Sequence, residues 1–175
     1  MKNYLILFLL FFPMIIFASE PEVVDAFDIT ESISKVDDLG VITKSEVDSL
    51  EVEAKVLFNA GDFKEAIPVL IEFSNKANLL ANLISASIDP YYRASYDEKQ
   101  KCFFSKYRPE ETLAKEYKEK RNIALAMQGE CLLKTGDKKG AIIVLLKALY
   151  LIDINNEIWW DRTQNNLFSI IEVDL

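Results

Sequence analysis

Apolar and polar positions divide the chain into three parts. A run of fourteen apolar residues covers Tyr4–Phe17, and the segment 19–43 mixes acidic residues with Ser and Thr without a sustained helical period. From Lys44 onward, apolar residues recur at every third or fourth position. This spacing places them on one face of an α-helix. We therefore expect an α-helical domain over 44–175.

Two segments of this domain, 50–70 and 125–145, align with each other at a constant offset. The positions that coincide are Leu50/Leu125, Ala54/Gly129, Leu57/Leu132, Gly61/Gly136, Asp62/Asp137, Ala66/Ala141 and Leu70/Leu145. Each segment predicts a helical hairpin, because the Gly suits the positive φ after a first helix and the Asp can cap a second helix. The small residues let the two helices approach closely.

These hairpins resemble the tetratricopeptide repeat (TPR), with a small residue midway along the first helix, Gly-Asp at the turn, and Ala in the second helix. The second copy continues through Lys147-Ala148-Leu149 to Asn155-Asn156, which is similar to the end of a family repeat, although Ile154 stands where the family has Pro. The resemblance implies an all-α, TPR-like helical-hairpin array with two clear repeats, a divergent middle and a C-terminal capping helix.

The predictions for the middle and for the C-terminal end of the array rest on weaker sequence signals. The offset between the two copies exceeds two TPR periods of about 34 residues each, which leaves room for a divergent repeat. We expect Asn75–Ser87 to be helical, a break at Asp89-Pro90, a second helical stretch over Tyr91–Lys106, and a long helix from Pro109 to Lys134. After Asn156 a last helix is expected to place Trp160 and Leu167 in the core and to present a polar outer face.

The first eighteen residues have the pattern of a secretory signal: Lys2, the apolar run, then the small residues Ala18 and Ser19. As a helix the run would span about 21 Å, less than the ~30 Å hydrocarbon core of a bilayer. We expect cleavage after Ala18 and an exported, periplasmic protein if the source is a bacterium. An uncleaved membrane anchor is the alternative.

The negative charge is concentrated at one end of the chain. The sequence has 28 acidic and 20 basic residues, a net charge of -8, and the segment 19–53 holds eleven of the acids against two lysines. The segment 54–175 is balanced at 17 against 17. We expect 19–43 to be an acidic flexible arm, or a docking segment for a basic partner. A pI near 4.7 argues against nucleic acid as a partner.

The composition also excludes several chemistries. The chain has no histidine, so it has no imidazole acid, base or metal ligand, and its two cysteines are too few for a four-thiolate zinc site. The sequence has no phosphate loop or metal motif, and the adjacent carboxylates Glu110/Glu111 and Asp97/Glu98 would point about 100° apart on a helix. We therefore expect no catalytic residues, no metal and no cofactor. Cys102 and Cys131 form either a disulfide or two small buried thiols.

The resemblance to TPR implies that a partner binds in a concave groove lined by the first helix of each hairpin. The candidate positions are Asp48, Glu51, Lys55 and Phe58 in the first copy, and Ile123, Met127, Glu130 and Lys134 in the second. Val52 and Met127 stand where TPR domains that clamp a C-terminal carboxylate have asparagines, which favours a mixed apolar and polar groove. Trp159 adjoins Trp160, so we expect one ring in the core and Trp159 to be an outward partner contact.

These features predict a non-catalytic scaffold or adaptor of the bacterial cell envelope that binds a peptide or helix of a partner protein. The alternative is a binding protein for a small molecule or a peptidoglycan fragment. It would use the aromatic-rich middle, although core packing that joins the two hairpins is the simpler explanation of those residues. The aromatic residues concerned are Tyr91, Tyr92, Tyr96, Phe103, Phe104 and Tyr107. An enzyme that uses carboxylates alone is the third and most distant hypothesis.

Overall fold

The computed structural model describes residues 42–93, 95–97 and 107–171. The chain divides into two compact units, Met1–Asp38 and Leu39–Leu175, and all described residues belong to the second unit. The expected signal peptide over 1–18 and nearly all of the expected acidic arm over 19–43 therefore lie outside the described residues. The same holds for Cys102 and for Phe103 and Phe104 of the aromatic-rich middle.

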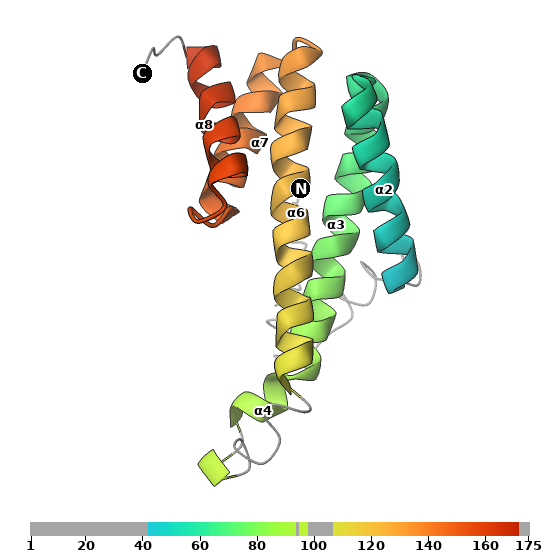
Figure 1. Ribbon diagram of the computed structural model, residues 1–175, viewed down its shortest axis with the longest axis vertical. Helices are drawn as coiled ribbons and strands as arrows, with labels where there is room; N and C mark the ends of the chain where they lie inside the picture. The colour runs from blue at the N-terminus through green and yellow to red at the C-terminus, as the bar shows by residue number, and fades with distance from the viewer. Residues whose placement is uncertain (1–41, 94, 98–106, 172–175) are drawn as a thin grey trace, which may run out of the picture. The chain divides into compact units, whose positions relative to one another are not determined.

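The second unit is all-α over its described residues, which confirms the fold class expected from the sequence (Figure 1). Its helices follow one another as antiparallel neighbours joined mostly by short turns, a packing consistent with a helical repeat array. The helices are α2 (Lys44–Ala60), α3 (Phe63–Ser87), the short α4 (Asp89–Arg93), α6 (Arg108–Lys134), α7 (Lys138–Leu151) and α8 (Glu157–Ile171).

Both predicted hairpin turns form at glycines in the left-handed region, Gly61 with φ 82° and Gly136 with φ 92°. Asp137 caps α7, since its carboxylate accepts a hydrogen bond from the backbone N–H of Gly140 at 2.9 Å. The matching prediction for Asp62 is wrong, because its side chain makes no cap bond to α3. The two copies differ three residues further on, where the second copy has Gly140 and the first has Glu65.

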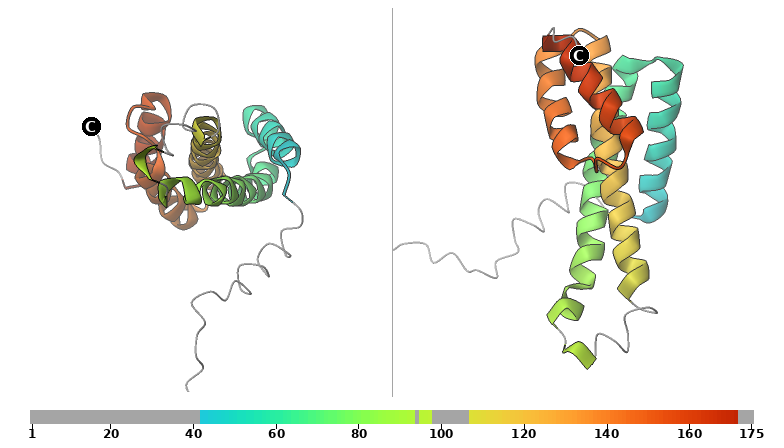
Figure 2. Two further views of the ribbon diagram at one scale, coloured as in Figure 1. Left: turned by 90° about the horizontal axis from the view of Figure 1, so that it is seen from below. Right: turned by 60° about the vertical axis from the view of Figure 1, so that its left-hand side comes forward.

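In the described residues, the divergent middle consists of long helices and a break at Ile88, one residue before the break expected at Asp89-Pro90. α3 runs for 25 residues, so Asn75–Ser87 continues the first hairpin, and α6 runs for 27 residues, which confirms the expected long helix. The two helices share the most extensive helix-helix contact of the unit. They project together beyond α2 and α7 to the short α4 (Figures 1 and 2).

Small residues set the close approach of the helices. Ala54, Ala66, Ala77 and Ala141 are fully or almost fully buried. Gly129 packs so tightly against α7 that a Cβ there would lie 2.6 Å from Leu145 Cδ2. Large side chains fill the remaining core between α2, α3 and α6, among them Leu70, Phe73 and Tyr117.

α8 ends the array as the sequence predicts. On its inner face, Thr163 and Leu167 are buried. Trp160 is half-buried and packs against the cluster that contains Leu125 and Ala148. Its outer positions are exposed and polar at a spacing of four residues: Glu157, Asp161, Asn165 and Ser169. This mostly polar outer face, on which Ile158 is an exposed exception, is the kind of surface that caps a helical repeat array.

Candidate binding surface

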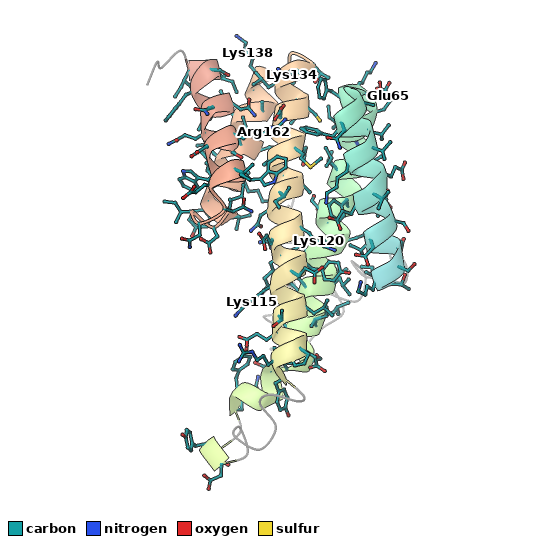
Figure 3. All side chains as sticks on the ribbon, viewed as in Figure 1. Glu65, Lys115, Lys120, Lys134, Lys138 and Arg162 are labelled. Carbon is teal, nitrogen blue, oxygen red and sulfur yellow. The ribbon has the colours of Figure 1, made fainter. Side chains whose placement is uncertain are left out.

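α2, α6 and α8 are the first helices of the two hairpins and the cap, and they carry all nine predicted contact residues on neighbouring surfaces. Arg162 of α8 joins them, because its guanidinium lies 5.2 Å from the Phe58 ring of α2 and 5.3 Å from the Trp159 ring. Figure 3 shows Arg162 directed toward α6, with Lys134 further along the same helix. The three helices therefore meet at one place, toward the C-terminal end of α6.

Three of the nine predicted contact residues are buried and do not offer a partner surface: Phe58, Met127 and Glu130 are 7, 3 and 7% exposed. Arg162 of α8 lies over the Phe58 ring and pairs with Glu130, whereas Met127 belongs to the core cluster that α2, α3 and α6 share. Arg162 donates two hydrogen bonds to Glu130, Nε to Oε2 at 2.7 Å and Nη2 to Oε1 at 2.9 Å. Here the structure corrects the predicted groove.

The Glu130 carboxylate is stabilised in its charged form despite its burial. Burial by itself raises its pKa, but the hydrogen bond and charge of Arg162 lower it, and Asn166 Nδ2 donates a further bond at 3.1 Å. The pKa of Glu130 therefore lies below its ordinary value. The charged pair is a structural contact between the second hairpin and its cap.

Toward the N-terminal half of α6, Lys120 engages the predicted acidic contacts of α2. Its Nζ lies 2.9 Å from Glu51 and 3.1 Å from Asp48, and Glu116 of its own helix lies at 3.1 Å. Tyr117 Oη donates a hydrogen bond to Asp48 at 2.8 Å. Burial raises the pKa of Asp48, but hydrogen bonds from Lys44, Tyr117 and Lys120 outweigh it and bring that pKa to about 2. Asp48 and Glu51 are thus neutralised within the chain.

The remaining predicted residues differ in accessibility. Lys55 is exposed and pairs with Glu51 at 2.6 Å, and Lys134 is exposed near Glu130. Ile123 is half-buried. Trp159 is also half-buried and packs against two core clusters, so the expectation of an outward tryptophan at this position is wrong. Arg162 stacks on its ring and holds it against α6.

A hollow of 570 Å³, hereafter the α6 hollow, lies between the N-terminal half of α6 and the turn from α7 to α8. Its floor is aliphatic and its sides carry amides and charges. It is lined by Lys115, Lys118, Glu119, Asn122, Ile123, Leu151, Ile152, Asp153, Asn155 and Asn156. Ile123 is the one predicted contact residue among them.

Asn122 explains why this hollow keeps its shape. Its side chain is buried within α6 and donates a hydrogen bond from Nδ2 to the backbone oxygen of Leu151 at 2.6 Å, which ties the end of α7 to α6. Asn156 in the following turn donates to Glu119 at 3.2 Å. Sequence reasoning missed this site, because its two sides come from segments far apart in the chain.

A second hollow, of 710 Å³, is different in kind. Its described lining residues are Lys44, Ser45, Asp48, Ser49 and Val52, which all belong to the first part of α2. One helix face does not enclose a ligand, so we do not treat this surface as a site.

The aromatic-rich middle is accessible where the structure describes it. Tyr92 and Tyr96 are 52 and 73% exposed, and Tyr107 is half-buried. Tyr92 Oη lies within hydrogen-bonding distance of Glu111, at 3.3 Å. Core packing therefore does not account for Tyr92 and Tyr96, while the side chain of Tyr91 lies outside the described set.

Cys131 is a free thiol buried in the core between α3 and α6, and Cys102, its possible disulfide partner, lies outside the described residues. Burial, together with the nearby Glu130 charge, raises the pKa of the Cys131 thiol to about 11. Among the described residues, no three Cys, Asp or Glu side chains gather in a way that suits a metal ion.

Fold and surface together define the class of the second unit: an all-α helical array with a capped C-terminal end and a polar, aliphatic-floored hollow beside its longest helix. No protein-family model matches the chain, and neither does a curated protein or a solved structure. In the part of the chain that the structure describes, none of the helices combines the length and the apolar character that a membrane crossing requires.

Proposed function

We propose that the chain is a non-catalytic adaptor that binds a segment of a partner protein, and that the segment lies in the α6 hollow. The observation that carries this proposal is the pairing of the predicted groove residues. Asp48, Glu51 and Glu130 are neutralised by Lys120 and Arg162, whereas the α6 hollow is open and lined by mixed chemistry.

The chemistry of the α6 hollow suits an extended peptide. A volume of 570 Å³ lies within the ~300–1,000 Å³ range of ligand pockets and accommodates a few side chains. Ile123, Leu151 and Ile152 offer an apolar floor for one of them. Asn155 and Asn156 carry amides that can bond a peptide backbone, and Lys115 and Lys118 favour an acidic side chain.

The TPR-like repeats support the same function, since arrays of helical hairpins provide extended binding surfaces. The signal pattern of residues 1–18 supports an exported, periplasmic adaptor in the cell envelope. N-terminal sequencing of the chain after expression in a bacterium tests this part. A new N-terminus at Ser19 is expected, and an intact Met1 in a membrane fraction would support the uncleaved anchor instead.

The binding proposal is tested by pull-down from an envelope extract with the wild-type chain, Ile123→Glu, and Val56→Glu as a control. Circular dichroism verifies that each variant is folded, because Ile123 is half-buried and packs against the core. Val56 is an aliphatic residue of α2 that is 61% exposed and does not line the α6 hollow. We expect Ile123→Glu to lose a defined partner that Val56→Glu retains. Equal retention by both variants would refute the hollow as the site.

The second candidate is a glycan or small-molecule binding protein, which the exposure of Tyr92 and Tyr96 favours. It predicts that a muramyl peptide raises the melting temperature and that Tyr96→Ala abolishes the shift. If that result appears while no protein partner is retained, the adaptor proposal fails and this candidate replaces it.

A further inference from the structure

The outer face of α7 combines large apolar side chains with lysines. Lys139, Ile143, Leu146, Lys147 and Tyr150 are exposed and share one face at helical spacing. Ile143, Leu146 and Tyr150 are 64, 52 and 89% exposed. We refer to these five residues as the α7 face.

This face is unusual because the opposite side of α7 is apolar as well. Ala141, Leu145 and Ala148 are fully buried against α6 and α8. A helix that is apolar on all sides is ordinarily enclosed by protein or lipid. α7 packs between α6 and α8 (Figure 1), and the exposure of Ile143, Leu146 and Tyr150 shows that none of the described helices covers its outer face.

Charge limits what can cover the α7 face. α7 contains Lys138, Lys139 and Lys147 and no acidic residue. Pairing of this face with the same face of a second copy would bring lysines against lysines, which is unfavourable. The surface that complements it is therefore both apolar and anionic. The acidic excess of the chain lies in residues 19–53, at the opposite end of the sequence.

Two kinds of surface are both apolar and anionic: an acidic partner helix and an anionic lipid bilayer. The shape of the α7 face decides which of the two fits it better. Neither of the hollows described above is lined by a residue of the α7 face. Tyr150 protrudes most, and two further aliphatic residues are exposed just after it, Ile154 at 65% and Ile158 at 79%. Separate protruding side chains enter a deformable interface more readily than they fit a rigid partner, whose ridges need matching grooves.

We propose that the α7 face lies on the surface of an anionic lipid bilayer. Ile143, Leu146 and Tyr150 enter the boundary between headgroups and acyl chains, and Lys139 and Lys147 reach the anionic headgroups on either side. With three apolar side chains the binding is weak and reversible, as expected for a single interfacial signal. This proposal is independent of the α6 hollow, because the two sites share no residue.

Vesicle co-sedimentation tests the proposal with the chain from Ser19 to Leu175, which excludes binding through the apolar run of Tyr4–Phe17. The described core of the array includes no residue before Ile42, so this form keeps every described contact. The vesicles contain either phosphatidylglycerol and phosphatidylcholine in equal parts or phosphatidylcholine alone. Circular dichroism verifies that each variant is folded.

We expect binding to the phosphatidylglycerol vesicles that falls at least about tenfold in Leu146→Asp and in the double variant Lys139→Glu/Lys147→Glu. The matched control Val56→Asp, an exposed aliphatic residue of α2, binds like the wild type. Binding also weakens as salt is raised, because the lysine contribution is electrostatic.

Three results would overturn the proposal. The first is equal binding to both kinds of vesicle, and the second is equal loss in Val56→Asp and Leu146→Asp. The third is the absence of vesicle binding together with tight binding of a synthetic acidic amphipathic helix that Leu146→Asp abolishes. In that case a partner helix covers the α7 face. Because Ile123→Glu does not alter this face, it should bind vesicles normally whether or not the adaptor proposal holds.

Discussion

Replacement of Arg162 by Ala tests how the cap is attached to the array. The substitution removes two charge-assisted hydrogen bonds, at 2.7 and 2.9 Å, from the Glu130 carboxylate and leaves it with Asn166 as its remaining described partner. It also removes a cation from the rings of Phe58 and Trp159. The variant therefore has a buried and poorly compensated charge.

The magnitude follows from the unequal exposure of the two partners. The Glu130 side chain is 9% exposed and that of Arg162 is 45% exposed. Loss of one partner costs roughly 3–5 kcal/mol in a fully buried pair and about 0.2–1 kcal/mol in an exposed pair. We expect an intermediate value of about 2 kcal/mol, with ~0.5 kcal/mol more from the aromatic contacts.

The loss of stability in Arg162→Ala depends on pH. In the wild type the pKa of Glu130 lies below its ordinary value of 4.5, so its stabilising effect is present above that pH and is lost as the pH falls. In Arg162→Ala, burial raises the pKa of Glu130, so its destabilising effect fades as the pH falls and the carboxyl binds a proton. The difference between the two proteins should therefore shrink from pH 7 toward pH 4.

Urea unfolding at both pH values, followed by tryptophan fluorescence, measures this difference. Arg93→Ala is the control, because Arg93 belongs to an exposed pair with Asp89 and should cost less than about 0.5 kcal/mol. The double variant Glu130→Gln/Arg162→Ala should be more stable at pH 7 than Arg162→Ala alone. A loss at pH 7 no larger than that of the Arg93→Ala control, or an equal loss at both pH values, would refute the reasoning.

Three further predictions concern the core and the network on α2. Gly129→Ala should destabilise the fold by about 1–2 kcal/mol in thermal unfolding although Ala favours helices, because its Cβ would lie 2.6 Å from Leu145 Cδ2; a more stable variant would contradict this packing. Asp48 should titrate near pH 2 in an NMR experiment, and Asp48→Asn should remove on the order of 1 kcal/mol of the stability lost as the pH falls from 4 to 2. With Cys102 replaced by Ser, Cys131 should react with iodoacetamide at pH 8 only in urea, since its thiol is buried with a pKa of about 11; rapid labelling of the folded chain would contradict this.

The helices could be predicted from the sequence because their signals are local. The period of apolar residues located α2, α3, α6, α7 and α8, and the Gly-Asp pairs located both turns. The absence of a breaker between Pro109 and Lys134 predicted the length of α6. The absence of a cap bond at Asp62 could not be predicted, because Asp62 and Glu65 have the spacing of a capping box.

The binding surface was less predictable because it depends on contacts between distant segments. Periodicity placed Phe58, Met127 and Glu130 on the side where a groove would lie, but it did not show that they are buried. Likewise the acidic residues Asp48 and Glu51 resemble partner contacts until Lys120 is placed beside them. Only the structure shows that the α6 hollow is open, since its walls come from α6 and from the turn after α7.

Photo-crosslinking in living cells tests the proposed protein-binding function most directly. A benzoylphenylalanine placed at Lys118, in the α6 hollow, is compared with one placed at Lys64, an exposed position of α3 outside both hollows. The proposal predicts a discrete adduct with one partner protein from position 118 and none from position 64. No adduct at position 118, or the same adducts from both positions, would contradict it.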